Sequence, residues 1–162
     1  MVSGVGLFKE DKLVDTIPNS KLFFFKLLAD KYGEGFYKVR LDGQEAAIHS
    51  ISSQHNLELS KKKPAEITIH IKIKGAIRAY TGKKITLKEV KMIEKTLEKQ
   101  VNEECLKLIN HFKKLEVDPI GLGNFARTKT RDFDLKKWED DYKNLSVKIR
   151  TDVTIIEAGV IE

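Results

Sequence analysis

The chain has 162 residues, of which 41% are hydrophobic, with only 3 prolines and 10 glycines, a composition typical of an ordered globular protein. The formal net charge is +6, but the positive charge is mostly lysine and is interspersed with acidic residues, and the scarcity of arginine leads us to expect no nucleic-acid partner. No run approaches the roughly 20 apolar residues of a transmembrane helix, and the single cysteine excludes an internal disulfide.

The N-terminal region predicts a hairpin followed by a short helix. Residues 4–9 and 12–16 have the pattern of two short strands joined by a tight turn. Residues 22–28 then form a helical segment that is apolar on nearly all sides. We expect this helix to end at Gly33 and Gly35, and to be either buried or docked onto a neighbouring domain.

The next region predicts a second hairpin, with a strong turn signal at Asp42-Gly43. Residues 36–41 form its first strand, and its second strand starts at Glu45. Along that second strand the apolar side chains change face after Ile48. The change of phase indicates a β-bulge or a bend.

Two further segments alternate between apolar and polar residues. The first, residues 66–77, follows a break at Lys61-Lys62-Lys63-Pro64, and the second spans residues 145–155. Each pattern is typical of a strand with one buried face and one face in water, and we expect the two strands to be neighbours. The polar face predicted for them comprises Thr68, His70, Lys72, Lys74, Lys148 and Arg150.

Residues 86–116 predict a long amphipathic helix. Thr86 and Glu89 form a T-x-x-E capping box, and Asp118-Pro119 closes the run. At ~1.5 Å per residue the helix is about 45 Å long, which is enough to cross a compact domain of this size. Its predicted apolar stripe comprises Val90, Ile93, Leu97, Val101, Cys105, Leu108, Phe112 and Leu115, with Leu87 at its edge.

The apolar stripe of this helix requires a covering surface, which we expect to be a sheet. Strands, a long helix and a returning strand predict an α+β fold, in which a mostly antiparallel or mixed sheet packs against one long helix, with short additional helices. We expect residues 1–162 to form a single domain. Met92 and Leu106 lie on the far side of the long helix, and we predict that they contact another domain or subunit.

Residue types that carry chemistry are present but do not combine into a site. His49 and His55 are six residues apart, too far to chelate a metal together, and neither has a cysteine or carboxylate at ligand spacing. Cys105 lies in the apolar stripe and is interpreted as a core residue. The segment from Gly121 to Ala126 matches G-x-G-x-x-A but follows a helix, so we interpret it as a turn. We therefore expect no metal, no cofactor and no catalytic residues.

The region after the long helix resembles a known family. The helix leads into Asp118-Pro119-Ile120-Gly121-Leu122-Gly123, and a final alternating strand ends in residues 154–159. This order resembles the C-terminal domain of the spore germination receptor C-subunit family, the Ger(x)C lipoproteins. Residues 5–14, 60–64 and 67–77 are also similar to that domain, so the resemblance covers essentially the whole chain. Its motif residues are Asp118, Gly121, Gly123, Arg127 and Trp138.

Two aromatic positions differ from the family pattern. The family usually has a second aromatic residue upstream of the tryptophan in a proline-containing segment, and Phe133 is the nearest equivalent here. Tyr142 stands where a phenylalanine is expected.

The resemblance implies a non-enzymatic subunit of a nutrient germinant receptor. The parent protein would be a lipoprotein on the outer face of the spore inner membrane, anchored by a lipidated cysteine that is not in this chain. Its implied partners are the A and B subunits of the receptor and the other domains of its own subunit.

Two other interpretations stay open. The polar face of the two alternating strands suits contact with an anionic membrane surface, although an ion-paired surface in water is the simpler interpretation. A small-molecule sensor domain that binds germinant directly predicts an enclosed apolar pocket and a ligand-dependent rise in melting temperature.

Overall fold

The computed structural model describes residues 4–29, 34–61 and 64–158. Of the residues singled out above, Gly33, Lys62, Lys63 and Gly159 lie outside the described residues. The elements in chain order are β1 (Gly4–Lys9), β2 (Lys12–Pro18), a short 3-10 turn η1 (Asn19–Lys21), α1 (Leu22–Ala29), β3 (Gly35–Leu41), β4 (Gln44–Leu59), β5 (Glu66–Tyr80), α2 (Leu87–Leu115), α3 (Leu122–Lys129), α4 (Leu135–Tyr142) and β6 (Ser146–Ala158).

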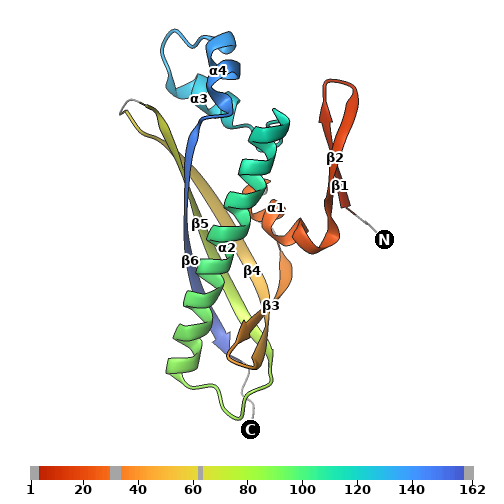
Figure 1. The fold of residues 1–162 in the computed structure, drawn as a ribbon. Helices are drawn as coiled ribbons and strands as arrows, with labels where there is room; N and C mark the ends of the chain where they lie inside the picture. The colour runs from red at the N-terminus through yellow and green to blue at the C-terminus, as the bar shows by residue number, and fades with distance from the viewer. Residues whose placement is uncertain (1–3, 30–33, 62–63, 159–162) are drawn as a thin grey trace.

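A four-stranded sheet and the long helix α2 form the body of the molecule (Figure 1). The strand order is β3-β4-β5-β6. The β3–β4 and β4–β5 pairs are antiparallel, whereas β5 and β6 are parallel, and α2 lies in the crossover connection that a parallel pair requires. The predicted α+β fold is confirmed, and the last strand does lie beside β5.

The β3–β4 hairpin turns at Asp42-Gly43, as predicted. Both residues have positive φ angles, 32° and 82°, which match the twist of the flanking strands in a two-residue hairpin turn. The register of β4 against β5 shifts between Ser50 and Ser52. As a result the buried positions change from Ser50 to Ser53, and this bulge explains the phase change in the sequence.

Helix α2 begins with the predicted capping box. Thr86 is its N-cap, and the Thr86 N–H donates to Glu89 Oε2 at 3.0 Å. The buried residues of α2 are Ile93, Leu97, Val101, Cys105, Leu108, Ile109 and Phe112. Leu87 is 82% exposed, so its predicted place at the edge of the stripe is wrong, and Ile109 is a core residue that the stripe omitted. The periodicity predicts which side of the helix is buried, but not how far along the helix the sheet and α1 cover that side.

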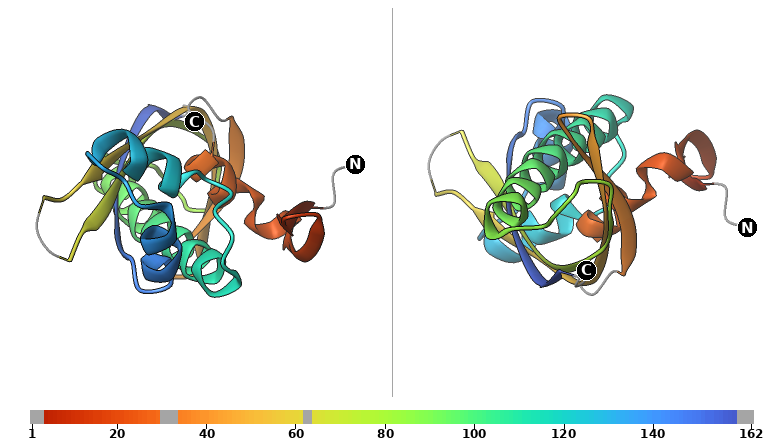
Figure 2. Two further views of the ribbon diagram at one scale, coloured as in Figure 1. Left: turned by 90° about the horizontal axis from the view of Figure 1, so that it is seen from above. Right: turned by 90° about the horizontal axis from the view of Figure 1, so that it is seen from below.

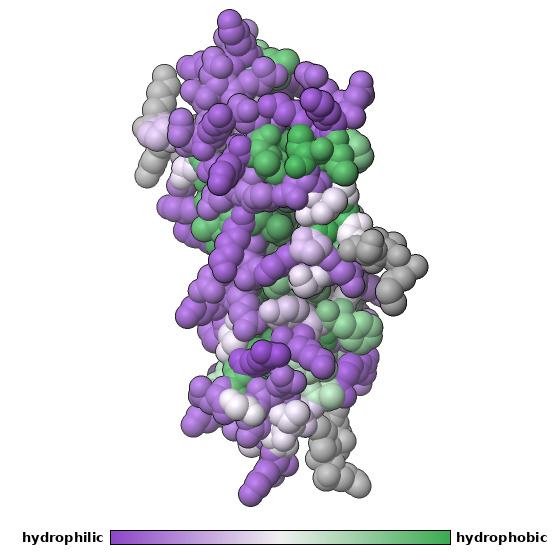
Figure 3. All heavy atoms as spheres, turned by 45° about the vertical axis from the view of Figure 1, so that its right-hand side comes forward, coloured by the Kyte–Doolittle hydropathy of each residue, from purple (hydrophilic) through white to green (hydrophobic). Residues whose placement is uncertain are grey.

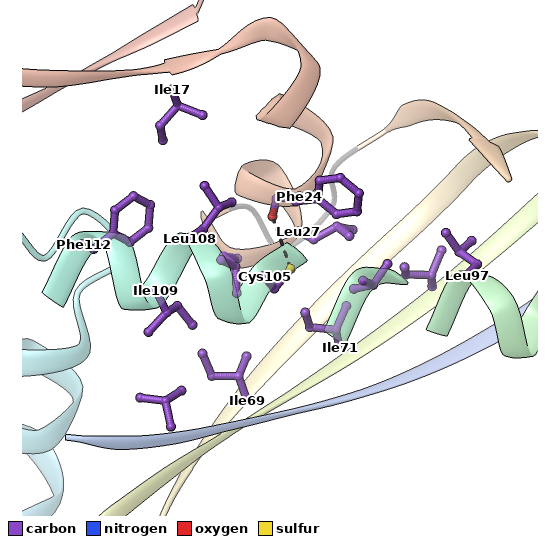
Figure 4. Packing of buried hydrophobic residues seen from close by; sticks show 14 of the residues in the cluster. Ile17, Phe24, Leu27, Ile69, Ile71, Leu97, Cys105, Leu108, Ile109 and Phe112 are labelled. Atoms are coloured by element: carbon purple, nitrogen blue, oxygen red, sulfur yellow. Dashed lines mark hydrogen bonds between the residues drawn. The ribbon is translucent and has the colours of Figure 1, made fainter. Parts of the chain in front are cut away.

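The core lies where α2 and α1 pack against the sheet and against each other (Figure 4). Ile69 and Ile71 of β5 approach α2 from the sheet, and Phe24 and Leu27 approach it from α1. Burial of one such side chain contributes roughly 1.5–3 kcal/mol to stability. The apolar helix α1 is therefore buried in the core of this domain, the first of the two positions that its sequence predicts.

Strands β1 and β2 form a separate two-stranded sheet that projects from the body (Figure 2). Leu7 and Ile17 are its buried residues and belong to the core cluster. Asp15 Oδ2 lies 2.5 Å from His111 Nε2 on α2. The N–H of Thr16, together with the His111 side chain, lowers the pKa of Asp15. Lys9 Nζ of β1 also lies 3.0 Å from Glu116 Oε2. The hairpin is thus held by two buried side chains and by charged contacts at both of its strands.

The same hairpin also exposes apolar side chains. Phe8 and Leu13 face each other in the register of the two strands, and both are exposed, as is Val14. Figure 3 brings forward the side of the molecule on which the hairpin stands. Hydrophilic residues predominate on that face, and its largest hydrophobic group lies in the upper half.

Carboxylates of α2 cover the outer edge of β6, which is an edge strand of the sheet. Glu98 Oε1 accepts a hydrogen bond from the Val153 N–H at 3.1 Å. Glu94 Oε1 accepts one from the Ile155 N–H at 3.0 Å. The helix therefore satisfies backbone donors that an edge strand otherwise leaves open to another chain.

Candidate functional site

The motif turn joins α2 to α3 through the carboxylate of Asp118. Its Oδ1 accepts the Leu122 N–H at 2.8 Å, and its Oδ2 accepts the Gly123 N–H at 2.7 Å. The Gly121 N–H donates to the Asp118 carbonyl at 3.2 Å, and Gly121 has a left-handed φ of 74°. Asp118 therefore caps the first turn of α3, and glycine at position 121 allows the backbone to reverse without strain.

Gly123 packs directly against the indole of Trp138 from α4. A Cβ atom on Gly123 would lie 2.7 Å from Trp138 Nε1 and 3.2 Å from Asp118 Oδ2. The Trp138 ring also packs near the rings of Phe133 and Tyr142, whose centroids lie 6.1 Å and 5.9 Å from its own. The second motif glycine is therefore required by close packing between two helices.

Tyr142 connects α4 to the end of α2. Its buried hydroxyl donates to the Val117 carbonyl at 2.6 Å. Burial, followed by the negative charge of Asp118, raises the pKa of Tyr142. The phenol therefore stays protonated at neutral pH and keeps this hydrogen bond, which the expected phenylalanine would lack.

The structure brings four of the five motif residues together and leaves Arg127 apart. We call the assembled group the α3–α4 corner; it comprises Asp118, Gly121, Gly123, Trp138 and Tyr142. Arg127 is exposed, and its guanidinium donates to Asn124 Oδ1 within the same helix at 3.1 Å. Both oxygens of Asp118 are already used by backbone donors. The corner is therefore a packed junction that orients two short helices.

His49, His70 and His111 each have a different partner, and His55 lines the same hollow as His70. His49 stacks on Phe36 with ring centroids 4.5 Å apart, and His70 Nε2 lies 3.3 Å from Glu58 Oε2. His111 pairs with the β1–β2 hairpin. Across residues 4–29, 34–61 and 64–158, no group of three or more His, Cys, Asp or Glu residues is placed to hold a metal ion.

Cys105 is a core residue, as its position in the apolar stripe predicts. Its Sγ lies 3.7 Å from the Phe24 carbonyl oxygen, to which it donates (Figure 4). Burial, followed by the charge of Glu104, raises the pKa of Cys105 to about 12. The thiol therefore stays protonated near pH 7 and is a poor nucleophile.

The predicted polar face of β5 and β6 carries charges of both signs. Thr68 lies opposite Lys148, and His70 lies opposite Arg150. Lys148 Nζ is 3.3 Å from Glu66 Oε1, so one of the lysines is neutralised. A shallow hollow at the side of this face is lined by Gln54, His55, Asn56, Glu58, His70 and Lys72. This surface is mixed and partly ion-paired.

Met92 and Leu106 are 41% and 37% exposed on α2, which agrees with their predicted place away from the core. A second shallow hollow is lined by Leu87, Lys88, Lys91, Met92 and Lys95. The sequence reasoning missed these lysines, although a spacing of three and then four residues was a visible signal for one helix face. In the part of the chain that the structure describes, no helix is both long and apolar enough to cross a membrane.

Comparison with known proteins decides which family combines these features. The family model described as spore germination B3/GerAC-like, C-terminal, matches residues 3–159. The chain belongs to this family. Membership confirms the resemblance that the order of the Asp118–Gly123 turn, Trp138 and the last strand predicts.

Two curated relatives and one solved structure agree with the family match. The chain is 34% identical to the spore germination protein GerQC of Bacillus cereus over 168 residues, which cover 99% of this chain and 46% of that protein. It is 24% identical to the putative spore germination protein YfkR of Bacillus subtilis (strain 168), over 99% of this chain and 44% of that protein. The crystal structure of the GerBC protein has the same fold, with a TM-score of 0.85 at 16% identity, over 95% of this chain and 51% of that chain. The chain thus spans about half the length of the curated relatives it matches.

Proposed function

We propose that this chain is the C-terminal domain of a C subunit of a nutrient germinant receptor, a non-enzymatic protein required for spore germination. The parent subunit is a lipoprotein at the spore inner membrane, and it acts by contacts with the A and B subunits and with its own other domains. The observation that carries this proposal is the family match over residues 3–159. The 34% identity to a protein named for spore germination supports the same role.

The surroundings of the reactive side chains support a non-enzymatic role. Cys105 is buried and its pKa is raised, and both carboxylate oxygens of Asp118 accept hydrogen bonds from backbone N–H groups. His70 and His111 each pair with a single carboxylate on the surface. An acid–base or nucleophilic mechanism needs such groups to converge on one reacting atom, and these groups lie in separate places.

Leu106 marks the contact that we propose with another receptor subunit. It is exposed on the outer face of α2, next to the ion pair in which Lys107 Nζ lies 3.4 Å from Glu104 Oε1. An apolar side chain bordered by charges of both signs suits a protein partner, because the rim of such a contact is polar. Met92, which the sequence grouped with Leu106, has a different surrounding of lysines.

The test is co-purification of the receptor from spore membranes with the full-length protein. We expect Leu106→Lys to lower recovery of the A and B subunits and to slow the nutrient-triggered loss of optical density of spores. Lys114→Ala, at an exposed position further along the same helix, is the matched control and leaves both unchanged. Normal germination of spores that lack the full-length protein would refute the receptor role, whereas unchanged recovery with Leu106→Lys would refute only this contact.

The sensor interpretation makes a different prediction and gains no support from the surface hollows. The hollow near His70 and the hollow near Met92 are both shallow and open to water. Direct binding of a nutrient to this domain would raise the melting temperature of the purified chain in a concentration-dependent way. We expect no such rise with nutrients that trigger germination of the source spores.

A further inference from the structure

One end of the molecule concentrates lysines, at the loop that enters α2 and on the first turns of that helix. We call this surface the lysine end; it comprises Lys83, Lys84, Lys88, Lys91 and Lys95 with the apolar Leu87 and Met92. All five lysines are exposed. Within the described residues, only Lys95 among them has an ion pair, with Glu98 Oε2 at 3.2 Å. Among the described residues, the other four lysines of the lysine end therefore stand without an ion pair.

The acidic residues on the same stretch of helix accept hydrogen bonds from backbone N–H groups, and Glu98 also pairs with Lys95. Glu89 closes the capping box by accepting the Thr86 N–H. Glu94 accepts the N–H of Ile155 on β6, and Glu98 accepts the N–H of Val153. The N-terminus of α2 adds the positive end of the helix dipole. The start of α2 therefore combines lysines that have no ion pair with the positive end of the helix dipole.

Apolar surface lies among these charges. Leu87 is 82% exposed and Met92 is 41% exposed, and both line one shallow hollow with three of the lysines. Lysines around a shallow apolar centre are the composition of helical segments that rest in the interface of an anionic bilayer.

We propose that the lysine end docks onto an anionic lipid surface, with the ammonium groups at the headgroup phosphates and Leu87 and Met92 inserted at the acyl boundary. The chemistry favours lipid over an acidic protein segment for two reasons. Lysines near an anionic leaflet each contribute roughly 1 kcal/mol of attraction, and this attraction needs no fixed pairing geometry. Lysine is also depleted at the centres of protein interfaces. The inference rests on this surface alone and does not depend on the receptor role.

This assignment differs from the membrane contact that the alternating strands suggested. On the polar face of β5 and β6, Lys148 pairs with Glu66 and Lys72 lies opposite Asp152. Charges of both signs are therefore mixed on this face. It has three lysines and one arginine, and it supplies a control surface on the same molecule.

The experiment is flotation of the purified chain with vesicles of phosphatidylcholine alone or of equal parts phosphatidylcholine and phosphatidylglycerol. We expect binding only to the anionic vesicles, decreasing as salt rises. Lys88→Glu with Lys91→Glu lowers the bound fraction at least about ten-fold. Lys72→Glu with Lys74→Glu, which changes the net charge equally on the sheet face, lowers it less than about two-fold.

Two further variants separate insertion from charge and from misfolding. Leu87→Ser removes the most exposed apolar side chain and weakens binding several-fold at high salt, where the electrostatic part is screened. Far-UV circular dichroism shows that each variant is folded, and the melting temperatures of the lysine-end variants stay close to that of the parent because the substituted residues are exposed.

Three outcomes would overturn the proposal. The first is equal flotation with neutral and anionic vesicles. The second is an equal loss of binding in the two charge-reversed variants, which would show that binding depends on net charge and not on the lysine end. The third is binding to poly-L-glutamate without binding to anionic vesicles, which would assign the lysine end to an acidic protein segment.

Discussion

At the scale of single residues, position 123 determines how closely α3 and α4 approach. Gly123 leaves just enough space for the Trp138 indole, and its N–H is held by Asp118. The glycine lies inside a helix, where alanine is normally preferred by about 1 kcal/mol. Helix propensity and packing therefore predict opposite signs for the same substitution.

We expect Gly123→Ala to destabilise the domain by about 1–3 kcal/mol, because the new methyl group would overlap the indole and push Trp138 out of place. The measurement is urea unfolding followed by circular dichroism and by Trp138 fluorescence. Lys129→Ala, at an exposed position of the same helix, is the control and stays within about 0.5 kcal/mol of the parent. A stabilised Gly123→Ala protein would show that the corner is looser than described.

Because of Cys105, we expect the free energy of unfolding to decrease at alkaline pH. Its thiol has a folded-state pKa near 12, above the value of 9.0 for an unburied thiol, so the unfolded chain loses this proton first. The contribution is complete below pH 9 and decreases as pH rises toward 12. Between pH 8 and 10 we expect the free energy of unfolding to fall by about 1.4 kcal/mol more in the parent than in Cys105→Ala. Equal pH dependence in urea titrations of the two proteins would contradict a buried, protonated thiol.

At the scale of elements, α2 protects the sheet as well as covering it. The strand β6 is at the edge of the sheet, and Glu94 and Glu98 accept hydrogen bonds from two of its N–H groups. Edge strands that lack such cover pair with other chains. The two glutamates therefore act against self-association.

We expect Glu94→Ala with Glu98→Ala to lower the free energy of unfolding by about 1–3 kcal/mol and to cause concentration-dependent association. The measurement is light scattering of the folded protein at increasing concentration, together with urea unfolding. Glu103→Ala, at an exposed position of the same helix, is the control. A double variant that stays monomeric would show that β6 is protected by other means.

The sequence specified most elements, but not how they are arranged. The Asp42-Gly43 turn, the Thr86–Glu89 cap and the isoleucine alternation of β5 were readable because each depends on residues close together in the chain. The parallel direction of β6 was not readable, since alternation is the same for parallel and antiparallel strands with one wet face. The contact of Gly123 with Trp138 was also hidden, because it joins two helices through packing and leaves no local pattern.

The candidate surfaces were predicted less completely than the fold. The exposure of Met92 and Leu106 was predicted from their positions on the far side of the long helix, but the sequence predicted the same role for both residues. Their surroundings distinguish them, because Met92 lies in a hollow with lysines and Leu106 lies beside an ion pair. Glu94 and Glu98 accept hydrogen bonds from β6, which limits their ion pairs with those lysines. This depends on the tertiary structure and cannot be predicted from sequence spacing.

At the scale of the whole molecule, α2 connects the α3–α4 corner at one end with the lysine end at the other (Figure 1). The core is continuous along this helix, from Ile93 to Phe112. We propose that the chain is a single cooperative domain, since the same buried residues serve the sheet, α1 and α2.

A single domain predicts coincident unfolding at both ends of the molecule. We expect Trp138 fluorescence, which reports on the corner, and far-UV circular dichroism, which reports on the helices and sheet, to give the same urea midpoint and slope. Trp138 is the only tryptophan in the chain, so the fluorescence signal has one source. Separate midpoints would divide the corner from the body.

The parallel pairing of β6 with β5 has a consequence for synthesis on the ribosome. β5 emerges early, but the strand that completes its second side follows only after α2, α3 and α4. Until then the isoleucines of β5 belong to a sheet that lacks its last strand. Pairing between strands so far apart in sequence is slow to form. We therefore expect the sheet to be completed late in synthesis, and its exposed apolar face to favour aggregation until then.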